Sequence, residues 1–91
     1  MKSLLVLPTY NEKDNLPVVF IKTLSLDAAF DVLVIDDNST DGTRDVARHW
    51  AAKDKRVNLL ERPSKLGLGT AYIAGFRWGL ERGYDCFVEM D

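Results

Sequence analysis

Two neighbouring carboxylates stand directly after an apolar run in the middle of the chain. Asp36 and Asp37 follow the run Val32-Leu33-Val34-Ile35. Successive side chains of a strand point to opposite faces, so one acid could face a ligand while the other holds the loop. A carboxylate can accept hydrogen bonds from a nucleobase N–H or from ribose hydroxyls. A simple turn, built from the many turn-forming residues that follow, is the alternative interpretation.

The segment after the first apolar run also carries groups that could bind a nucleotide. Residues 4–7 are followed by Pro8-Thr9-Tyr10-Asn11-Glu12. The ring of Tyr10 could lie against a nucleobase. The carboxylate of Glu12 could accept a hydrogen bond from a base or a sugar. A surface turn after Pro8 would use the same residues, so both interpretations stay open.

Two glycines and an acid complete the set of candidate groups. Gly67 and Gly69 stand at the start of a helical pattern, where bare backbone and a helix N-terminus could approach an anion. Their spacing does not match the dinucleotide-binding fingerprint, which has a third glycine and follows the first strand. Asp91 follows the last apolar run, and a carboxylate there could hold a divalent cation beside a diphosphate.

The elements that must position these groups alternate between strand and helix patterns. Apolar runs predict strands at residues 4–7, 32–35, 57–60 and 86–90, with Pro8 ending the first. Helical spacing predicts helices that begin near residues 15, 41 and 70. Asn15 is the expected N-cap of the first helix, and Thr40 or Asp41 that of the second. The inward residues expected in the third helix are Ile73, Phe76 and Leu80.

This alternation favours an α/β fold with a mostly parallel sheet and helices on both faces. Ligands of such sheets bind beyond the carboxyl ends of the strands. The four candidate segments therefore converge on one edge of the sheet, and this convergence is the main argument for a binding site.

The composition is that of a small globular domain and excludes several function classes. The chain has 91 residues, of which 46% are hydrophobic and 29% charged, with a formal net charge of −2. This balance gives no sign of a nucleic-acid surface or of a basic membrane-binding surface in this segment. No stretch approaches the roughly 18 apolar residues that a membrane helix needs.

Together, these segments resemble the opening motifs of family 2 glycosyltransferases of the GT-A fold. The residues that carry the resemblance are Pro8-Thr9-Tyr10-Asn11-Glu12 and Ile35-Asp36-Asp37-Asn38-Ser39-Thr40-Asp41-Gly42-Thr43. The run Lys65-Leu66-Gly67-Leu68-Gly69-Thr70-Ala71-Tyr72-Ile73-Ala74-Gly75-Phe76 is similar to the polyprenol- or dolichol-phosphate mannose synthase branch. Glu89-Met90-Asp91 resembles the start of the Asp-Ala-Asp metal motif of that branch. The resemblance covers the whole chain and implies a Rossmann-like N-terminal half of a GT-A domain.

The resemblance implies a role for each matching residue. The residues implied to contact the nucleotide sugar GDP-mannose are Pro8, Tyr10, Glu12, Ile35, Asp37 and Asp91. Asp91 would be the first acid of the metal motif, near Mg²⁺ or Mn²⁺ and the diphosphate, and it is the catalytic residue that the resemblance implies.

The implied reaction is a metal-dependent, inverting transfer of mannose from GDP-mannose to a polyprenyl (dolichyl) phosphate. Such an acceptor would bring the enzyme to the cytoplasmic face of a membrane. Residues 1–91 would be the N-terminal, nucleotide-sugar-binding part of one glycosyltransferase domain, cut at its metal motif. We expect this segment alone to be catalytically inactive.

Two other functions are compatible with the same motifs. A UDP-sugar-dependent transferase of family 2 with another acceptor would share the opening segments, and a nucleotide-binding module would use them without turnover. A signalling receiver domain fits poorly, because its acid pair follows the first strand rather than the second.

Overall fold

Strands and helices alternate along the chain, as the sequence predicts. The computed structural model describes residues 2–25, 30–64 and 67–89. In chain order the elements are β1 (Ser3–Thr9), α1 (Leu16–Leu24), β2 (Phe30–Asp37), α2 (Thr43–Lys53), β3 (Val57–Arg62), α3 (Leu68–Glu81) and β4 (Cys86–Glu89). The expected last residue of the fourth strand, Met90, lies outside the described residues, as does Asp91. Within the described ranges, no helix is both long and apolar enough to cross a membrane.

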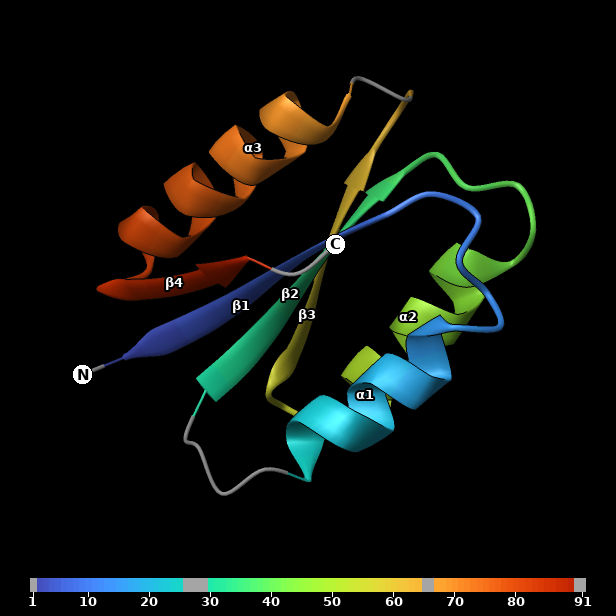
Figure 1. Ribbon diagram of the computed structural model, residues 1–91, viewed down its shortest axis with the longest axis horizontal. Coiled ribbons are helices and arrows are strands. Elements are labelled where there is room, and N and C mark those ends of the chain that lie inside the picture. The colour runs from blue at the N-terminus through green and yellow to red at the C-terminus, as the bar shows by residue number, and fades with distance from the viewer. Residues whose placement is uncertain (1, 26–29, 65–66, 90–91) are drawn as a thin grey trace.

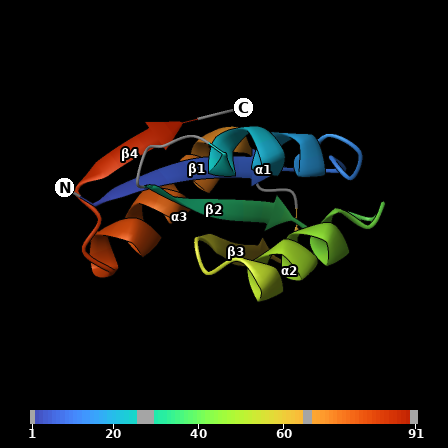
Figure 2. The same ribbon diagram turned by 90° about the horizontal axis from the view of Figure 1, so that it is seen from below.

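The described strands form one parallel sheet in the order β3-β2-β1-β4. Helices α1 and α2 cover one face of this sheet and α3 covers the other (Figures 1 and 2). Parallel neighbours need long crossover connections, and here each crossover contains a helix. The predicted α/β fold is therefore confirmed.

The two central strands are buried on both faces, which explains why their sequences are continuously apolar. On the face covered by α1 and α2, the core includes Leu5, Leu7, Val32, Val34, Phe20 and Ala47. On the face covered by α3, the core includes Leu4, Val6, Leu33, Ile35 and Ala71. This alternation continues to the ends of the strands. It therefore determines whether a polar residue there faces α1 and α2 or faces α3.

Strands β1, β2 and β3 all run further than the sequence predicts, and β3 reaches Arg62. Strand β1 continues through Pro8 to Thr9, so the prediction that Pro8 ends it is wrong. Proline is tolerated in a strand where no neighbour needs its N–H, and the described pairing of β1 with β4 has already ended at Val6. Strand β2 includes Asp36 and Asp37, so the two acids are strand residues and their side chains alternate.

The helix N-caps agree only in part with the prediction. Asn15 is the N-cap of α1, but its side chain donates to Glu12 Oε2 at 3.3 Å instead of capping the helix. The N-cap of α2 is Gly42, with φ of 99°, so the choice of Thr40 or Asp41 is wrong. Glycine adopts this left-handed conformation without steric cost.

The fully buried residues of helix α3 are small. Ala71, Gly75 and Gly79 are buried, whereas Ile73 and Leu80 are 53% and 64% exposed. The prediction that Ile73 and Leu80 face inward is therefore wrong. At Gly75 and Gly79 the helix backbone approaches the strands so closely that a side chain has no room, whereas Phe76 packs against the core as predicted. The spacing of apolar residues does not reveal this close approach.

Adding a methyl group at Gly75 should destabilise the fold. A Cβ there would lie 2.7 Å from Val6 Cγ1 and 2.8 Å from Ile35 Cδ1, both in the rigid core. We expect Gly75→Ala to lower the free energy of unfolding by about 1–3 kcal/mol in urea denaturation. Gly69→Ala is the matched control, because its Cβ would meet no atom within 4 Å. That control should be neutral or up to about 1 kcal/mol more stable, and equal losses in both variants would contradict the close approach.

Candidate functional site

The segments that follow β1 and β2 are hydrogen-bonded to each other. The backbone N–H of Asn11 donates to Ser39 Oγ at 2.9 Å, and that of Thr40 donates to Asn11 Oδ1 at 2.8 Å. The N–H of Glu12 donates to Thr43 Oγ1 at 2.8 Å, at the start of α2. These bonds fix the first two candidate segments side by side at the carboxyl end of the sheet, as predicted.

Asp36 holds the loop that follows β2. Its side chain is fully buried on the face covered by α1 and α2, where it accepts hydrogen bonds from three donors. The N–H and the hydroxyl of Ser39 donate to it, at 2.9 and 2.5 Å, and the Thr9 hydroxyl donates at 3.1 Å. One of the two acids therefore organises the loop, as the sequence predicts.

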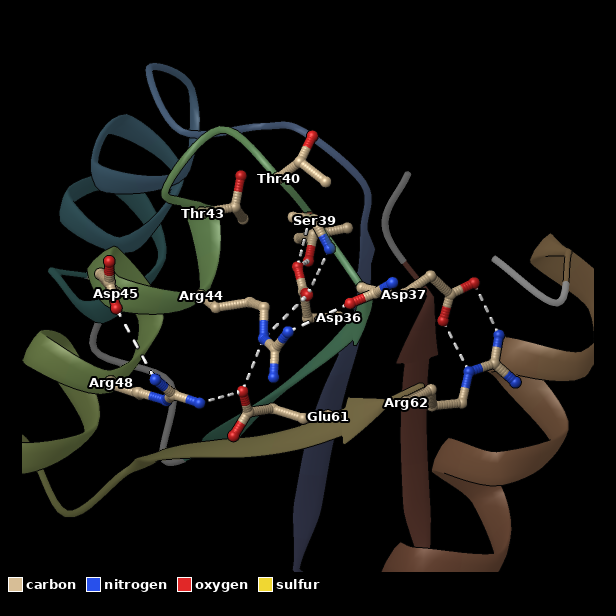
Figure 3. Close-up of polar contacts among 12 residues, drawn as sticks. Asp36, Asp37, Ser39, Thr40, Thr43, Arg44, Asp45, Arg48, Glu61 and Arg62 are labelled. Carbon is tan, nitrogen blue, oxygen red and sulfur yellow. Dashed lines mark hydrogen bonds and ion pairs between the residues drawn. The ribbon is translucent and has the colours of Figure 1, made fainter. Parts of the chain in front are cut away.

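Two arginines of α2 balance the acids on this face. Asp36 lies opposite Glu61 of β3 in the parallel register, and like charges in such positions repel. Arg44 Nε donates to Glu61 Oε1 at 2.7 Å and lies 3.8 Å from Asp36 Oδ2, while Arg48 also pairs with Glu61 (Figure 3). The hydrogen bond from Arg44, together with that from Arg48, lowers the pKa of the Glu61 carboxyl below its usual value.

Asp37 points to the opposite face of the sheet and pairs with Arg62. Arg62 Nε donates to Asp37 Oδ1 at 2.6 Å, and Nη2 donates to Oδ2 at 2.8 Å (Figure 3). The two side chains are only 9% and 10% exposed. Such two-point pairs between a guanidinium and a carboxylate combine charge with fixed geometry. The orientation of Asp37 is therefore fixed by its neighbour on β3.

The same guanidinium also contacts the start of α3. Arg62 Nη1 donates to Thr70 Oγ1 at 3.1 Å, and Nη2 donates to the Gly67 carbonyl at 3.2 Å. Sequence reasoning missed Arg62. The available signal was a basic residue at the end of the third predicted strand, but its register against Asp37 becomes visible only in the folded sheet.

A pocket of about 270 Å³ opens beside this pair, at the carboxyl end of the sheet. Its lining residues come from the ends of β1 and β2 and from the start of α3: Pro8, Thr9, Tyr10, Glu12, Asp37, Gly67, Leu68 and Ala71. An aromatic ring, two carboxylates and apolar surface thus surround one hollow. This combination suits a flat heterocycle that also carries hydrogen-bond donors.

Two of the predicted site residues lie elsewhere or are not described. Ile35 is fully buried beneath α3, in the core, and does not line the pocket. Asp91 lies outside the described residues. Among residues 2–25, 30–64 and 67–89, no group of three or more His, Cys, Asp or Glu side chains could hold a metal ion. The described part of the chain therefore does not form a metal site by itself.

The chain belongs to glycosyl transferase family 2, whose sequence profile matches residues 4–91. It is 55% identical over 91 residues to an undecaprenyl-phosphate mannosyltransferase of Micrococcus luteus, covering 100% of this chain and 37% of the relative. It is 47% identical to a polyprenol monophosphomannose synthase of Mycolicibacterium smegmatis, covering 99% of this chain and 34% of the relative. The chain thus spans about a third of the length of these relatives.

A solved structure shares the fold. The mannosyltransferase PcManGT from Pyrobaculum calidifontis, in complex with GDP-Man and Mn²⁺, matches with a TM-score of 0.74 and 28% identity. The match covers 85% of this chain and 24% of that protein. It confirms the GT-A fold that the sequence motifs imply.

Removing the carboxylate of Asp36 should destabilise the protein. In Asp36→Ala the N–H and hydroxyl of Ser39 lose their acceptor, and the Thr9 hydroxyl keeps only the Ile35 carbonyl, at 3.4 Å. We therefore expect the free energy of unfolding in urea to fall by about 2–4 kcal/mol. Asp45→Ala is the control, because Asp45 is 83% exposed and its ion pair with Arg48 is 3.6 Å long. Its loss should stay below about 0.5 kcal/mol. A loss of the same size in both variants would show that Asp36 does not hold the loop.

Proposed function

We propose that the full-length protein containing this chain transfers mannose from GDP-mannose to the phosphate of a polyprenyl phosphate, inverting the anomeric centre. The observation that carries this proposal is the meeting of Tyr10, Glu12 and Asp37 in one pocket at the carboxyl end of the sheet. The names of the two relatives, both polyprenol-phosphate mannosyl transferring enzymes, support the substrate class. The GDP-Man in the related structure supports the donor.

The pocket offers the contacts that a guanine base needs. The Tyr10 side chain is partly exposed and borders the pocket, where its ring could stack on the base. Asp37 uses its two oxygens for Arg62, but a carboxylate has about four acceptor positions in all. The remaining positions can accept from the adjacent N1–H and amino group of guanine. Uracil offers a single ring N–H instead, so this arrangement favours guanine.

The proposed chemistry needs little from a general base. A phosphate acceptor is already ionised near neutral pH, so it can attack the sugar without prior proton removal. We infer that Asp91 takes part in holding Mg²⁺ or Mn²⁺ with groups outside the described residues, and the Mn²⁺ of the related structure supports a divalent ion. When bound, such an ion would neutralise the charge that develops on the departing GDP.

We further propose that residues 1–91 form the N-terminal, nucleotide-sugar-binding part of a single transferase domain. The coverage of 37% and 34% of the two relatives supports a segment of a longer transferase, and the pocket of Tyr10, Glu12 and Asp37 supports the nucleotide-binding role. The segment alone would then bind nucleotide but lack turnover. Because a polyprenyl phosphate resides in a membrane, the reaction would take place at a membrane surface, on the cytoplasmic face where nucleotide sugars are available.

Calorimetric titration of GDP and UDP into the full-length protein, with Mn²⁺ present, tests the donor assignment. Tighter binding of GDP, weakened by a chelator, is the expected result. A preference for UDP would keep the family and move the function to another sugar transferase. Binding of GDP without any mannosyl transfer to a polyprenyl phosphate would mark a nucleotide-binding module, and the absence of binding would overturn the pocket assignment.

Truncating Tyr10 should weaken nucleotide binding without unfolding the protein. Because its side chain is already 40% exposed, the main effect of Tyr10→Ala should be the loss of ring stacking on the nucleobase. We expect the Kd for GDP to rise by about tenfold. Tyr10→Phe keeps the ring and should bind GDP within about threefold of the wild type. Equal Kd values for all three proteins would remove Tyr10 from the site.

Replacing Asp91 should remove the effect of the metal ion on GDP binding and on mannosyl transfer. In Asp91→Ala of the full-length protein, Mn²⁺ should no longer tighten GDP binding, and metal-dependent mannosyl transfer should disappear. The affinity for GDP measured without metal should stay unchanged, because the base pocket is intact. Full transfer activity of Asp91→Ala would exclude Asp91 from the metal site.

A further inference from the structure

Among the residues that the structure describes, three segments build the walls of the base pocket. The first is the end of β1 with the residues that follow it, the second is Asp37 at the end of β2, and the third is the start of α3 at Gly67 and Leu68. Hydrogen bonds between the segments after β1 and β2 fix the first wall to the second. The third wall belongs to a different crossover, so a separate contact must hold it in place.

Arg62 makes that contact. Its guanidinium donates at 2.6 and 2.8 Å to the carboxylate of Asp37, and at 3.2 and 3.1 Å to the Gly67 carbonyl and the Thr70 hydroxyl. The Thr70 hydroxyl in turn donates to the Gly67 carbonyl at 2.9 Å. The planar group therefore sets both the orientation of Asp37 and its distance from the first turn of α3.

Arginine suits this position better than lysine does. The guanidinium offers five N–H donors in one rigid plane, whereas a lysine ammonium is a point charge on a flexible stem. Arg62 is 9% exposed and is not among the residues that line the pocket. We therefore expect Arg62 to act on a ligand through Asp37 and the start of α3.

We propose that Arg62 is a positioning residue that fixes the width of the base pocket and so determines the selection between purine and pyrimidine nucleotides. The inference rests on the proposed function in assigning this pocket to the base. A pocket of fixed width holds one ring system in contact with Tyr10 and Asp37 together. When the third wall can shift, the preferred base loses contacts, while the diphosphate and ribose, which both kinds of nucleotide share, keep theirs.

The test compares GDP and UDP binding to three variants of the full-length protein by calorimetry. Arg62→Lys keeps the positive charge beside Asp37 but loses the planar guanidinium with its two N–H donors to the carboxylate. It should reduce the ratio of the GDP and UDP affinities by about tenfold or more. Thr70→Val removes the hydroxyl that Arg62 contacts on α3 but keeps the Asp37 pair and the Gly67 contact, so it should reduce the ratio less, in the same direction. Arg48→Lys is the matched control, because Arg48 pairs with Glu61 on the other face of the sheet, and it should leave the ratio unchanged.

The outcomes separate this inference from the proposed function. The preference of the wild type for GDP or UDP tests the proposed function, whereas the change of that preference in the variants tests Arg62, whichever base the wild type prefers. An unchanged ratio in both Arg62→Lys and Thr70→Val would overturn the inference. So would an equal loss of affinity for both nucleotides in Thr70→Val, which leaves the buried ion pair intact.

Discussion

The register between β2 and β3 is the constraint on which the arrangement of this edge depends. It places Asp36 opposite Glu61 and Asp37 opposite Arg62. Because side chains alternate along a strand, the first pair faces α1 and α2, and the second pair faces α3 (Figure 3). A shift of the pairing between β2 and β3 by one residue would turn both acids to the opposite faces. Asp36 would then point toward the pocket and Asp37 toward α1 and α2.

The two faces use their charges differently. On the face of α1 and α2, Arg44 and Arg48 are 33% and 53% exposed, and ion pairs at such exposure stabilise a protein by about 1 kcal/mol or less. On the face of α3, the pair of Asp37 and Arg62 is nearly buried. Removing one partner of such a pair costs about 3–5 kcal/mol, because the other charge stays behind without compensation. The same buried pair therefore supports the fold and orients a pocket residue.

The sequence predicted the element order, the parallel sheet and the meeting of Tyr10, Glu12 and Asp37, because these follow from short apolar runs and from the rule that parallel strands end at one edge. The predictions from sequence were wrong or incomplete where contacts between residues far apart in the chain determine the structure. Ile73 and Leu80 have the spacing of a buried face, yet α3 approaches Val6 through Gly75, and both large residues are exposed. Arg62 was missed because its partner, Asp37, lies on another strand, and a single sequence does not display register.

A crystal structure of the full-length protein with GDP and Mn²⁺ would show whether the pocket between Tyr10, Asp37 and the start of α3 binds the base of the donor nucleotide. We expect the guanine ring to lie against Tyr10, with its N1–H donating to the Asp37 carboxylate and the ion pair between Asp37 and Arg62 intact. A guanine ring bound outside this pocket would exclude the base assignment, and an Arg62 side chain that leaves Asp37 to contact the nucleotide would exclude its positioning role.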